Sequence, residues 1–222
     1  LKFTAVSSNA FAASKLRAMK AYGADIVLEE SSDGTLNPEL FQRMKDKVQK
    51  ISSQSGSFYF DQFGSADIRP SYASIGLEIA DEMDGSIDAF CNAVGTAGSL
   101  MGTVDGLAQS GITPDIYALE PLQSPLLTTG KGGGHLVEGI ALGFIPPFLD
   151  MSMIKESRAI DQEAGFEMCR RLSKEEGILA GGSTGLNVVA ALKLAKELGV
   201  GKRIVTLGCD NGIKYLEGHI FS

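Results

Sequence analysis

Residues 88–102 read DAFCNAVGTAGSLMG, and this stretch decides the fold that the sequence predicts. It opens with an apolar run rich in strand formers, turns through glycines and hydroxyls, and continues into a helical pattern. A strand, a glycine turn and a helix in this order point several backbone N–H groups and the positive end of a helix dipole at one spot. Gly95 and Gly98 permit close backbone approach, and Thr96 and Ser99 add hydroxyl donors. The turn therefore favours a phosphate, although such glycines can also serve tight packing alone.

A second glycine turn is built in the same way. Residues 181–185 read GGSTG, follow the short apolar run 177–180 and precede a strong helical pattern over 186–198. Two such turns at the C-terminal ends of parallel strands can face one crevice where the strand order reverses. A ligand with a phosphate at one end and a ring at the other would fit that arrangement. Taken alone, the second turn is better explained by packing, with Ser183 or Thr184 as a helix N-cap.

The rest of the chain predicts an α/β protein in two domains. The first sixty residues alternate strand and helix patterns, which favours a parallel sheet; the expected segments are strands 2–6, 25–28 and 58–60 and helices 11–22 and 37–51. Residues 62–71 show no periodicity and can form a crossing between domains. We therefore expect one domain over residues 1–62 and a second over residues 63–222.

Composition narrows the class of protein. The 222 residues carry a formal net charge of −7 with acids and bases mixed, which argues against nucleic acid or an anionic membrane as partner. No run approaches a membrane span in length, and no secretory signal is visible. Cys91, Cys169 and Cys209 lie far apart, so we expect neither a metal site nor a disulfide framework, and a cytoplasmic location.

A nicotinamide dinucleotide is one rival ligand for the first turn. The spacing Gly95-x-x-Gly98-x-x-x-Gly102 resembles that of short-chain dehydrogenases, and Glu120 ends the next strand 25 residues after Gly95, near where a ribose-binding acid is expected. Against this, Pro121 follows Glu120 directly, the turn lies mid-chain, and no Tyr-x-x-x-Lys pair occurs. An oxidoreductase is therefore the less favoured hypothesis.

Several motifs match a different family. Residues 175–185 read EEGILAGGSTG, residues 95–99 stand where that family has a Gly-Thr-Gly-Gly-Thr phosphate loop, and residues 138–146 read EGIALGFIP, as in its mobile active-site segment. Gln62-Phe63 matches a pair whose glutamine contacts the substrate carboxylate. With these motifs the sequence resembles, over nearly its whole length, the fold type II pyridoxal-phosphate enzymes, in particular the cysteine synthase (O-acetylserine sulfhydrylase) and cystathionine β-synthase group.

The resemblance implies a fold, a cofactor and a set of binding residues. The fold would be the two-domain, tryptophan synthase β-like architecture, with residues 1–62 as a remnant of the smaller domain and residues 63–222 as the larger, cofactor-binding domain. Such proteins are usually homodimers. Pyridoxal 5′-phosphate would be the cofactor, Ser183 would meet its pyridine nitrogen, and Gln62 and Gly139 would contact the substrate. The phosphate would be held by Gly95, Thr96, Ala97, Gly98 and Ser99.

The implied activity is β-replacement or β-elimination on serine or an O-activated serine, giving cysteine from sulfide. A serine hydroxyl at the pyridine nitrogen leaves the ring a weaker electron sink than an aspartate would, which suits this chemistry. Two departures bear on substrate choice: residues 64–70 replace the family's Asn-Pro-Ala-Asn stretch, and Cys209 stands where a proline is usual. Ala97 also replaces a glycine in the phosphate loop.

No lysine of this chain lies in the family's Ser-x-Lys-Asp-Arg motif. The resemblance therefore implies that the Schiff-base lysine lies upstream of Leu1, and the chain alone is expected to be inactive, with no catalytic residue of its own. The alternative is a non-catalytic remnant or binding module that keeps the fold and lacks the chemistry.

Overall fold

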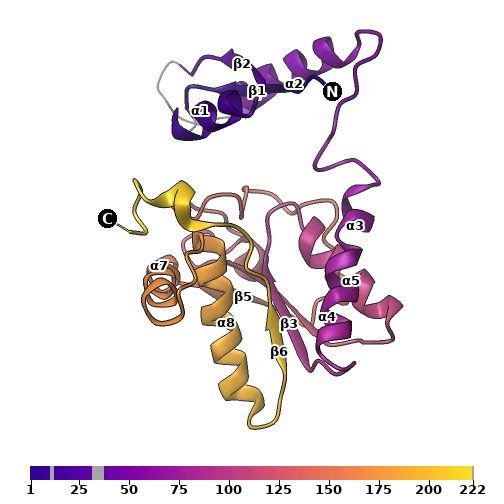
Figure 1. Cartoon of the computed structure of the whole chain (residues 1–222), viewed down its shortest axis with the longest axis vertical. Helices are drawn as coiled ribbons and strands as arrows, with labels where there is room; N and C mark the ends of the chain where they lie inside the picture. Colours follow the sequence, from indigo (N-terminus) through magenta and orange to yellow (C-terminus); the bar gives the residue numbers. More distant parts are fainter. Residues whose placement is uncertain (11–12, 32–37, 222) are drawn as a thin grey trace. The chain divides into compact units, whose positions relative to one another are not determined.

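The computed structural model describes residues 1–10, 13–31 and 38–221. The chain divides into two compact units, Leu1–Asp61 and Gln62–Ser222 (Figure 1). The first residues of the two helices expected at 11–22 and 37–51 lie outside the described residues. Which unit corresponds to which domain of the resembled family stays a prediction.

The first unit is a small β-α-β-α arrangement. Strands β1 (Thr4–Ser8) and β2 (Asp25–Glu29) pair in parallel, with Thr4 opposite Asp25. Helix α1 (Ala13–Ala21) connects them, and α2 (Pro38–Ser52) follows β2. The crossover between two parallel strands is the unit that the alternating sequence pattern predicts.

The strand expected over residues 58–60 is not formed. Phe58, Tyr59 and Phe60 are 79%, 45% and 57% exposed, and they pair with no strand among the described residues. Aromatic residues favour strands only because they pack on a pleated, half-buried surface. These three side chains do not pack on such a surface, so their strand propensity does not produce a strand here.

The second unit is built on a parallel sheet of four strands in the order β5-β4-β3-β6. Successive strands run outward from β3 to β4 to β5, and the chain then returns to place β6 on the other side of β3. The strand order therefore reverses between β3 and β6, and ligands of such sheets bind at the carboxyl ends of strands at this point. The bounds of its elements are α3 (Ile68–Ser71), α4 (Ala73–Glu82), β3 (Ala89–Ala93), α5 (Gly98–Gln109), β4 (Asp115–Pro121), α6 (Leu126–Thr129), η1 (Met151–Met153), β5 (Glu156–Ile160), α7 (Gln162–Arg171), η2 (Leu172–Glu176), α8 (Gly182–Leu198), β6 (Ile204–Thr206) and η3 (Gly212–Tyr215).

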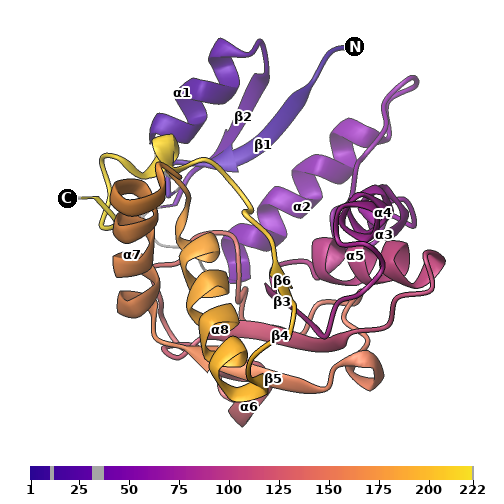
Figure 2. The same cartoon turned by 60° about the horizontal axis from the view of Figure 1, so that its bottom comes forward.

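Helices cover both faces of this sheet, as Figures 1 and 2 show. Alternate residues of β3 point to opposite sides: Cys91 packs in one core cluster with residues of α7 and α8, and Phe90 packs in the other with residues of α4 and α5. A strand buried on both faces reads as a nearly continuous apolar run, which is the pattern of residues 89–94.

Several glycines of this unit serve helix packing. A Cβ on Gly76 of α4 would collide with the carbonyl oxygen of Thr103 on α5, and one on Gly106 would collide with that of Ala73. Gly102 faces the backbone of Arg69 in the same way. Gly102, which fits the dehydrogenase spacing, is thus explained by the close approach of α3 and α5.

The helical segment that follows Asp161 has two parts. Helix α7 ends at Arg171, and a π-helical turn, η2, covers the rest before Gly177 ends it at φ +70°. Strand β5 begins at Glu156, three residues after the short helix η1 ends at Met153. Within the part of the chain that the structure describes, no helix has the length and apolar character needed to cross a membrane.

Candidate functional site

The first glycine turn, Gly95–Ser99, connects the end of β3 to the first residues of α5. Ala97 adopts a left-handed conformation at φ 65°, and its side chain is buried in the core cluster of α4 and α5. A left-handed residue with a Cβ costs about 1–2 kcal/mol, which explains why glycine suits this position. In this turn the N–H groups of Thr96, Ala97 and Ser99 have no acceptor among the described residues.

The hydroxyl groups of this turn are oriented by hydrogen bonds from inside the protein. Thr96 Oγ1 accepts from the N–H of Gly98 at 3.2 Å, and Ser99 Oγ accepts from Asn92 Nδ2 at 3.0 Å. Each hydroxyl thus keeps its own proton for a partner elsewhere. Three N–H groups without acceptors, two hydroxyl donors and the N-terminus of a helix of 12 residues make this turn suited to an anion.

The second glycine turn, Gly181–Gly185, opens α8. Ser183 lies in the first turn of the helix, and Thr184 Oγ1 accepts from the N–H of Cys209 at 3.0 Å. Gly181 has no room for a side chain, because a Cβ there would collide with the carboxylate of Asp210. The second turn is therefore fastened to the segment that follows β6.

The Cys209 thiol, on the segment that follows β6, lies beside this second turn. Burial among protein atoms raises its pKa, although hydrogen bonds with Ser183 and Asn187 act in the opposite direction. The residue nevertheless keeps exposed surface. A protonated thiol beside Ser183 is thus part of the candidate site.

Two buried asparagines connect the two turns. Asn187 of α8 donates from Nδ2 to Asn92 Oδ1 at 2.7 Å, and Asn92 in turn donates to Ser99. Both side chains are fully buried. The structure therefore brings the two turns together at the carboxyl end of β3, where the strand order reverses.

A third segment reaches the first turn. A Cβ on Gly95 would collide with the carbonyl oxygen of Gly139, and the N–H of Ala141 donates to the carbonyl oxygen of Val94 at 2.9 Å. His135 Nε2 lies 3.1 Å from the carbonyl oxygen of Ala141, so a hydrogen bond also joins the two ends of residues 135–141. These residues and those up to Pro146 are called the Gly139 segment. Gly139 itself has φ +84°, which only glycine adopts readily.

The remaining predicted site residue, Gln62, opens the second unit and is exposed. Its neighbour Phe63 packs against Phe144 with ring centroids 5.3 Å apart. Residues 62–63 and the segment that contains Gly139 are therefore held together by an aromatic contact. The structure thus gathers the predicted substrate residues in one region, whereas their role stays a prediction.

Sequence reasoning missed Asn92 and Asn187 as members of the site. Each is a single amide in an otherwise apolar buried element, within the runs AFCNA and GLNVVAAL. A buried amide needs hydrogen-bond partners, so an isolated asparagine in a core strand is a signal that can be noticed. Its partner cannot be identified, because the two residues are 95 positions apart.

Glu120 does not fit the dinucleotide hypothesis. Its carboxylate is 2% exposed and accepts three hydrogen bonds from its own chain, from the N–H groups of Leu127 and Thr128 at 2.7 and 2.9 Å and from Thr128 Oγ1 at 2.7 Å. These bonds hold helix α6 against the end of β4. The carboxylate is therefore engaged in the fold and is not presented to a ribose.

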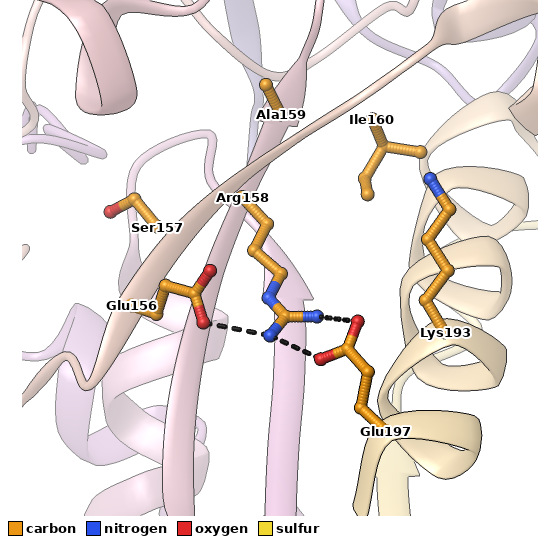
Figure 3. A pocket seen from close by; sticks show the side chains of 7 residues that line it. All are labelled: Glu156, Ser157, Arg158, Ala159, Ile160, Lys193 and Glu197. Carbon is orange, nitrogen blue, oxygen red and sulfur yellow. Dashed lines mark hydrogen bonds and ion pairs between the residues drawn. The ribbon is translucent and has the colours of Figure 1, made fainter.

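A separate hollow of about 360 Å³ lies between β5 and α8 (Figure 3). Two cations line it, Lys193 and Arg158, and Arg158 pairs with Glu156 at 2.8 Å and with Glu197 at 2.7 Å. The carboxylate of Glu197, followed by that of Glu156, raises the pKa of Arg158. Both carboxylates of the hollow are engaged by Arg158, so an ion-pair network on the edge strand accounts for them.

Comparison with known proteins agrees with this geometry. Residues 1–210 match the family described as "Pyridoxal-phosphate dependent enzyme". The chain belongs to this family of enzymes. The glycine turns, Ser183 and the Gly139 segment are all inside the matched region, and the family assignment confirms the resemblance, the α/β fold and the cofactor class that the motifs predict.

Individual relatives narrow the comparison. The chain is 36% identical over 206 residues to a cysteine synthase of Staphylococcus aureus, which covers 92% of this chain and 64% of the relative. It is similar to the crystal structure of an O-acetylserine-dependent cystathionine β-synthase from Helicobacter pylori, with TM-score 0.86, 31% identity and coverage of 100% and 71%. An O-ureido-L-serine synthase structure gives TM-score 0.88 at 28% identity, with coverage of 99% and 68%. The chain thus spans about two thirds of the length of these relatives.

Proposed function

We propose that the protein carries out pyridoxal-phosphate dependent β-replacement or β-elimination on serine or an O-activated serine, of the cysteine synthase type, with sulfide or a thiol as the second substrate. The meeting of the two glycine turns through the Asn92–Asn187 hydrogen bond supports this most strongly. The relatives are enzymes by name, which favours a catalytic protein over the alternative of a binding module.

The first glycine turn would hold the phosphate. Its N–H groups without acceptors and its two outward hydroxyl protons offer donors only, as a phosphate dianion requires. No lysine or arginine is needed at this end, because the helix α5 N-terminus supplies partial positive charge. Gly95 and Gly98 are required here by packing, because a Cβ on Gly95 would collide with the carbonyl oxygen of Gly139 and one on Gly98 with the side chain of Ile68.

Ser183 would meet the pyridine nitrogen. A hydroxyl can donate to an unprotonated nitrogen and carries no charge that would draw a proton onto the ring. Bound pyridoxal phosphate would supply a ring that stabilises negative charge at the α-carbon of an amino acid. The neutral partner keeps that electron demand moderate, which suits loss of a β-substituent.

The Gly139 segment and Gln62 would hold the amino-acid substrate. The Gly139 carbonyl touches the first turn, and the Phe63–Phe144 contact ties Gln62 to the same segment. The side-chain amide of Gln62 is exposed and is able to donate to a carboxylate. Movement of one of these segments would therefore change the position of the other.

We also propose that the protein acts as a homodimer. The first unit exposes large apolar side chains that a partner surface would cover, among them Phe3 at 63%, Phe41 at 51% and Phe60 at 57%. Light scattering at several concentrations should give the mass of two chains. A single chain at every concentration would contradict the dimer.

The function is tested by equilibrium binding of pyridoxal phosphate to the 222-residue chain, followed by absorbance and fluorescence. We expect saturable binding that Ser183→Ala weakens and that Ser86→Ala, at an exposed position, leaves unchanged. Binding tighter than that of pyridoxal would show that the phosphate is recognised. Absence of saturable binding, or preferential binding of a nicotinamide dinucleotide, would exclude the proposal.

A further inference from the structure

Hydrogen bonds between side-chain amides connect the two glycine turns. Backbone groups determine which atom donates and which accepts in each of these bonds. Asn187 Oδ1 accepts from the N–H of Ala93 at 2.8 Å, and Asn187 Nδ2 donates to the carbonyl oxygen of Leu207 at 2.9 Å. A backbone N–H can only donate and a carbonyl can only accept. The orientation of the Asn187 amide therefore has one solution.

That orientation determines the next two groups. Since Asn187 presents Nδ2 to Asn92, the atom of Asn92 at 2.7 Å must be its oxygen. The other atom of the Asn92 amide is then Nδ2, which donates to Ser99 Oγ at 3.0 Å. Ser99 is made an acceptor on its inner side, and its own proton has to be donated outward.

Burial makes this arrangement costly to change. Asn92 and Asn187 are each 0% exposed, so no water competes for their polar atoms. Rotating either amide would bring two donors or two acceptors face to face in the interior, which costs the full desolvation of the unpaired groups. Helix α8 lies along β3 and β6 in both views, which holds the pair in place (Figures 1 and 2).

We propose that Asn187 and Asn92 are positioning residues that direct the hydroxyl proton of Ser99 toward the phosphate of the bound cofactor. The inference rests on the proposed function, because it needs the phosphate at the first glycine turn. It adds that the ring end and the phosphate end of the site are coupled, because Cys209 Sγ, beside Ser183, lies 3.4 Å from Asn187 Nδ2 and donates to Asn92 Oδ1 at 3.7 Å. A change at the second turn therefore alters whether Ser99 of the first turn can donate a hydrogen bond to the phosphate.

The test reverses the donor and acceptor roles in these hydrogen bonds without removing Ser99. In Asn187→Asp the carboxylate still accepts from Ala93 and can no longer donate, so the Asn92 amide rotates to donate toward it. The oxygen of Asn92 then faces Ser99, which donates inward and is lost to the phosphate. Asn92→Asp gives the same reversal by a second route, because a carboxylate beside Ser99 accepts its proton.

The measurement is the ratio of the dissociation constants of pyridoxal and pyridoxal phosphate, for the full chain and each variant. We expect each reversal to lower this phosphate preference by about tenfold, the effect of one hydrogen bond to a charged group, while pyridoxal binds as before. Ser99→Ala should lower it similarly. Added to Ser99→Ala, either reversal should change the preference by no more than about twofold, since its target is gone.

Three results would overturn the inference. The preference can stay unchanged in the reversals, both ligands can weaken equally, or the reversals can act as strongly in the Ser99→Ala background as without it. If one reversal fails to fold in a thermal unfolding control, the other decides. An unmodified chain without any phosphate preference would exclude the proposed function itself, so the two failures are distinguishable.

Discussion

The carbonyl oxygen of Gly139 lies so close to Gly95 that it would collide with a Cβ on that residue. The contact joins the first glycine turn to the segment that the family resemblance connects with the substrate. Both partners are backbone groups, so neither can rotate away from a collision. The glycine at position 95 is therefore required by the fold.

We expect Gly95→Ala to lower the free energy of unfolding by about 1–3 kcal/mol, the usual cost of overpacking a well-packed site. The displaced segment should also lose the hydrogen bond from the Ala141 N–H to Val94, so exchange of that N–H should accelerate. Urea unfolding and amide exchange measure the two effects. Gly134→Ala is the matched control, since a Cβ there has nothing within 4 Å. Equal stability of the two variants would contradict the packing argument.

Glu120→Gln tests whether the buried carboxylate is structural. An amide keeps one acceptor and sets an NH₂ group against the N–H donors of Leu127 and Thr128, so we expect a loss of about 1–3 kcal/mol in the free energy of unfolding. Glu82→Gln, at an exposed position on α4, should stay within about 0.5 kcal/mol of the unmodified chain. A stable Glu120→Gln variant with altered dinucleotide binding would instead revive the oxidoreductase hypothesis.

Local patterns correctly predict the elements whose stability depends on residues that are close together in the sequence. The run that ends in Ala93 and the glycine turn after it form a strand, a turn and a helix, because each step is encoded by adjacent residues. Residues 58–60 fail for the opposite reason, since a strand needs a partner that propensity does not specify.

The same distinction applies to the site. Gly95, Ser99 and Ser183 are predicted from motifs, because a glycine turn at a helix start has a local physical reason. The Asn92–Asn187 pair is not found, since its geometry arises only when β3 and α8 pack together. The direction of the hydrogen bonds likewise depends on Ala93 and Leu207, which no pattern connects to Ser99.

The buried thiols make stability depend on pH in the alkaline range. Burial raises the pKa of both Cys91 and Cys169 to about 11 from an ordinary value of 9.0. Between these values the unfolded chain loses protons that the folded chain retains, so stability is complete below pH 9 and falls as the pH rises toward 11. The pKa of Tyr215 is also raised, chiefly by burial, and this adds to the fall above pH 10.

Urea unfolding from pH 7 to 10.5 checks this expectation. The double variant Cys91→Ala/Cys169→Ala should be less stable at pH 7, where it lacks buried side chains, and should show a smaller loss between pH 8.5 and 10. Tyr215→Phe is the control, because it keeps both thiols and should keep the loss in that interval. An unchanged pH profile in the double variant would mean that other groups cause it.

Cys209 offers a probe of the second glycine turn that needs no activity. It is the exposed thiol of the three, whereas Cys91 and Cys169 are 0% exposed. A disulfide reagent such as dithiobis(nitrobenzoate) at pH 8 should therefore modify one thiol in the folded chain and all three after unfolding. The modification should be slower than for a free thiol, because burial by neighbouring atoms raises the pKa of Cys209. Since the thiol lies beside Ser183, saturating pyridoxal phosphate should slow it further, and Cys209→Ala should abolish the fast phase. A modification rate that the cofactor leaves unchanged would place the ring away from Ser183 and contradict its assignment.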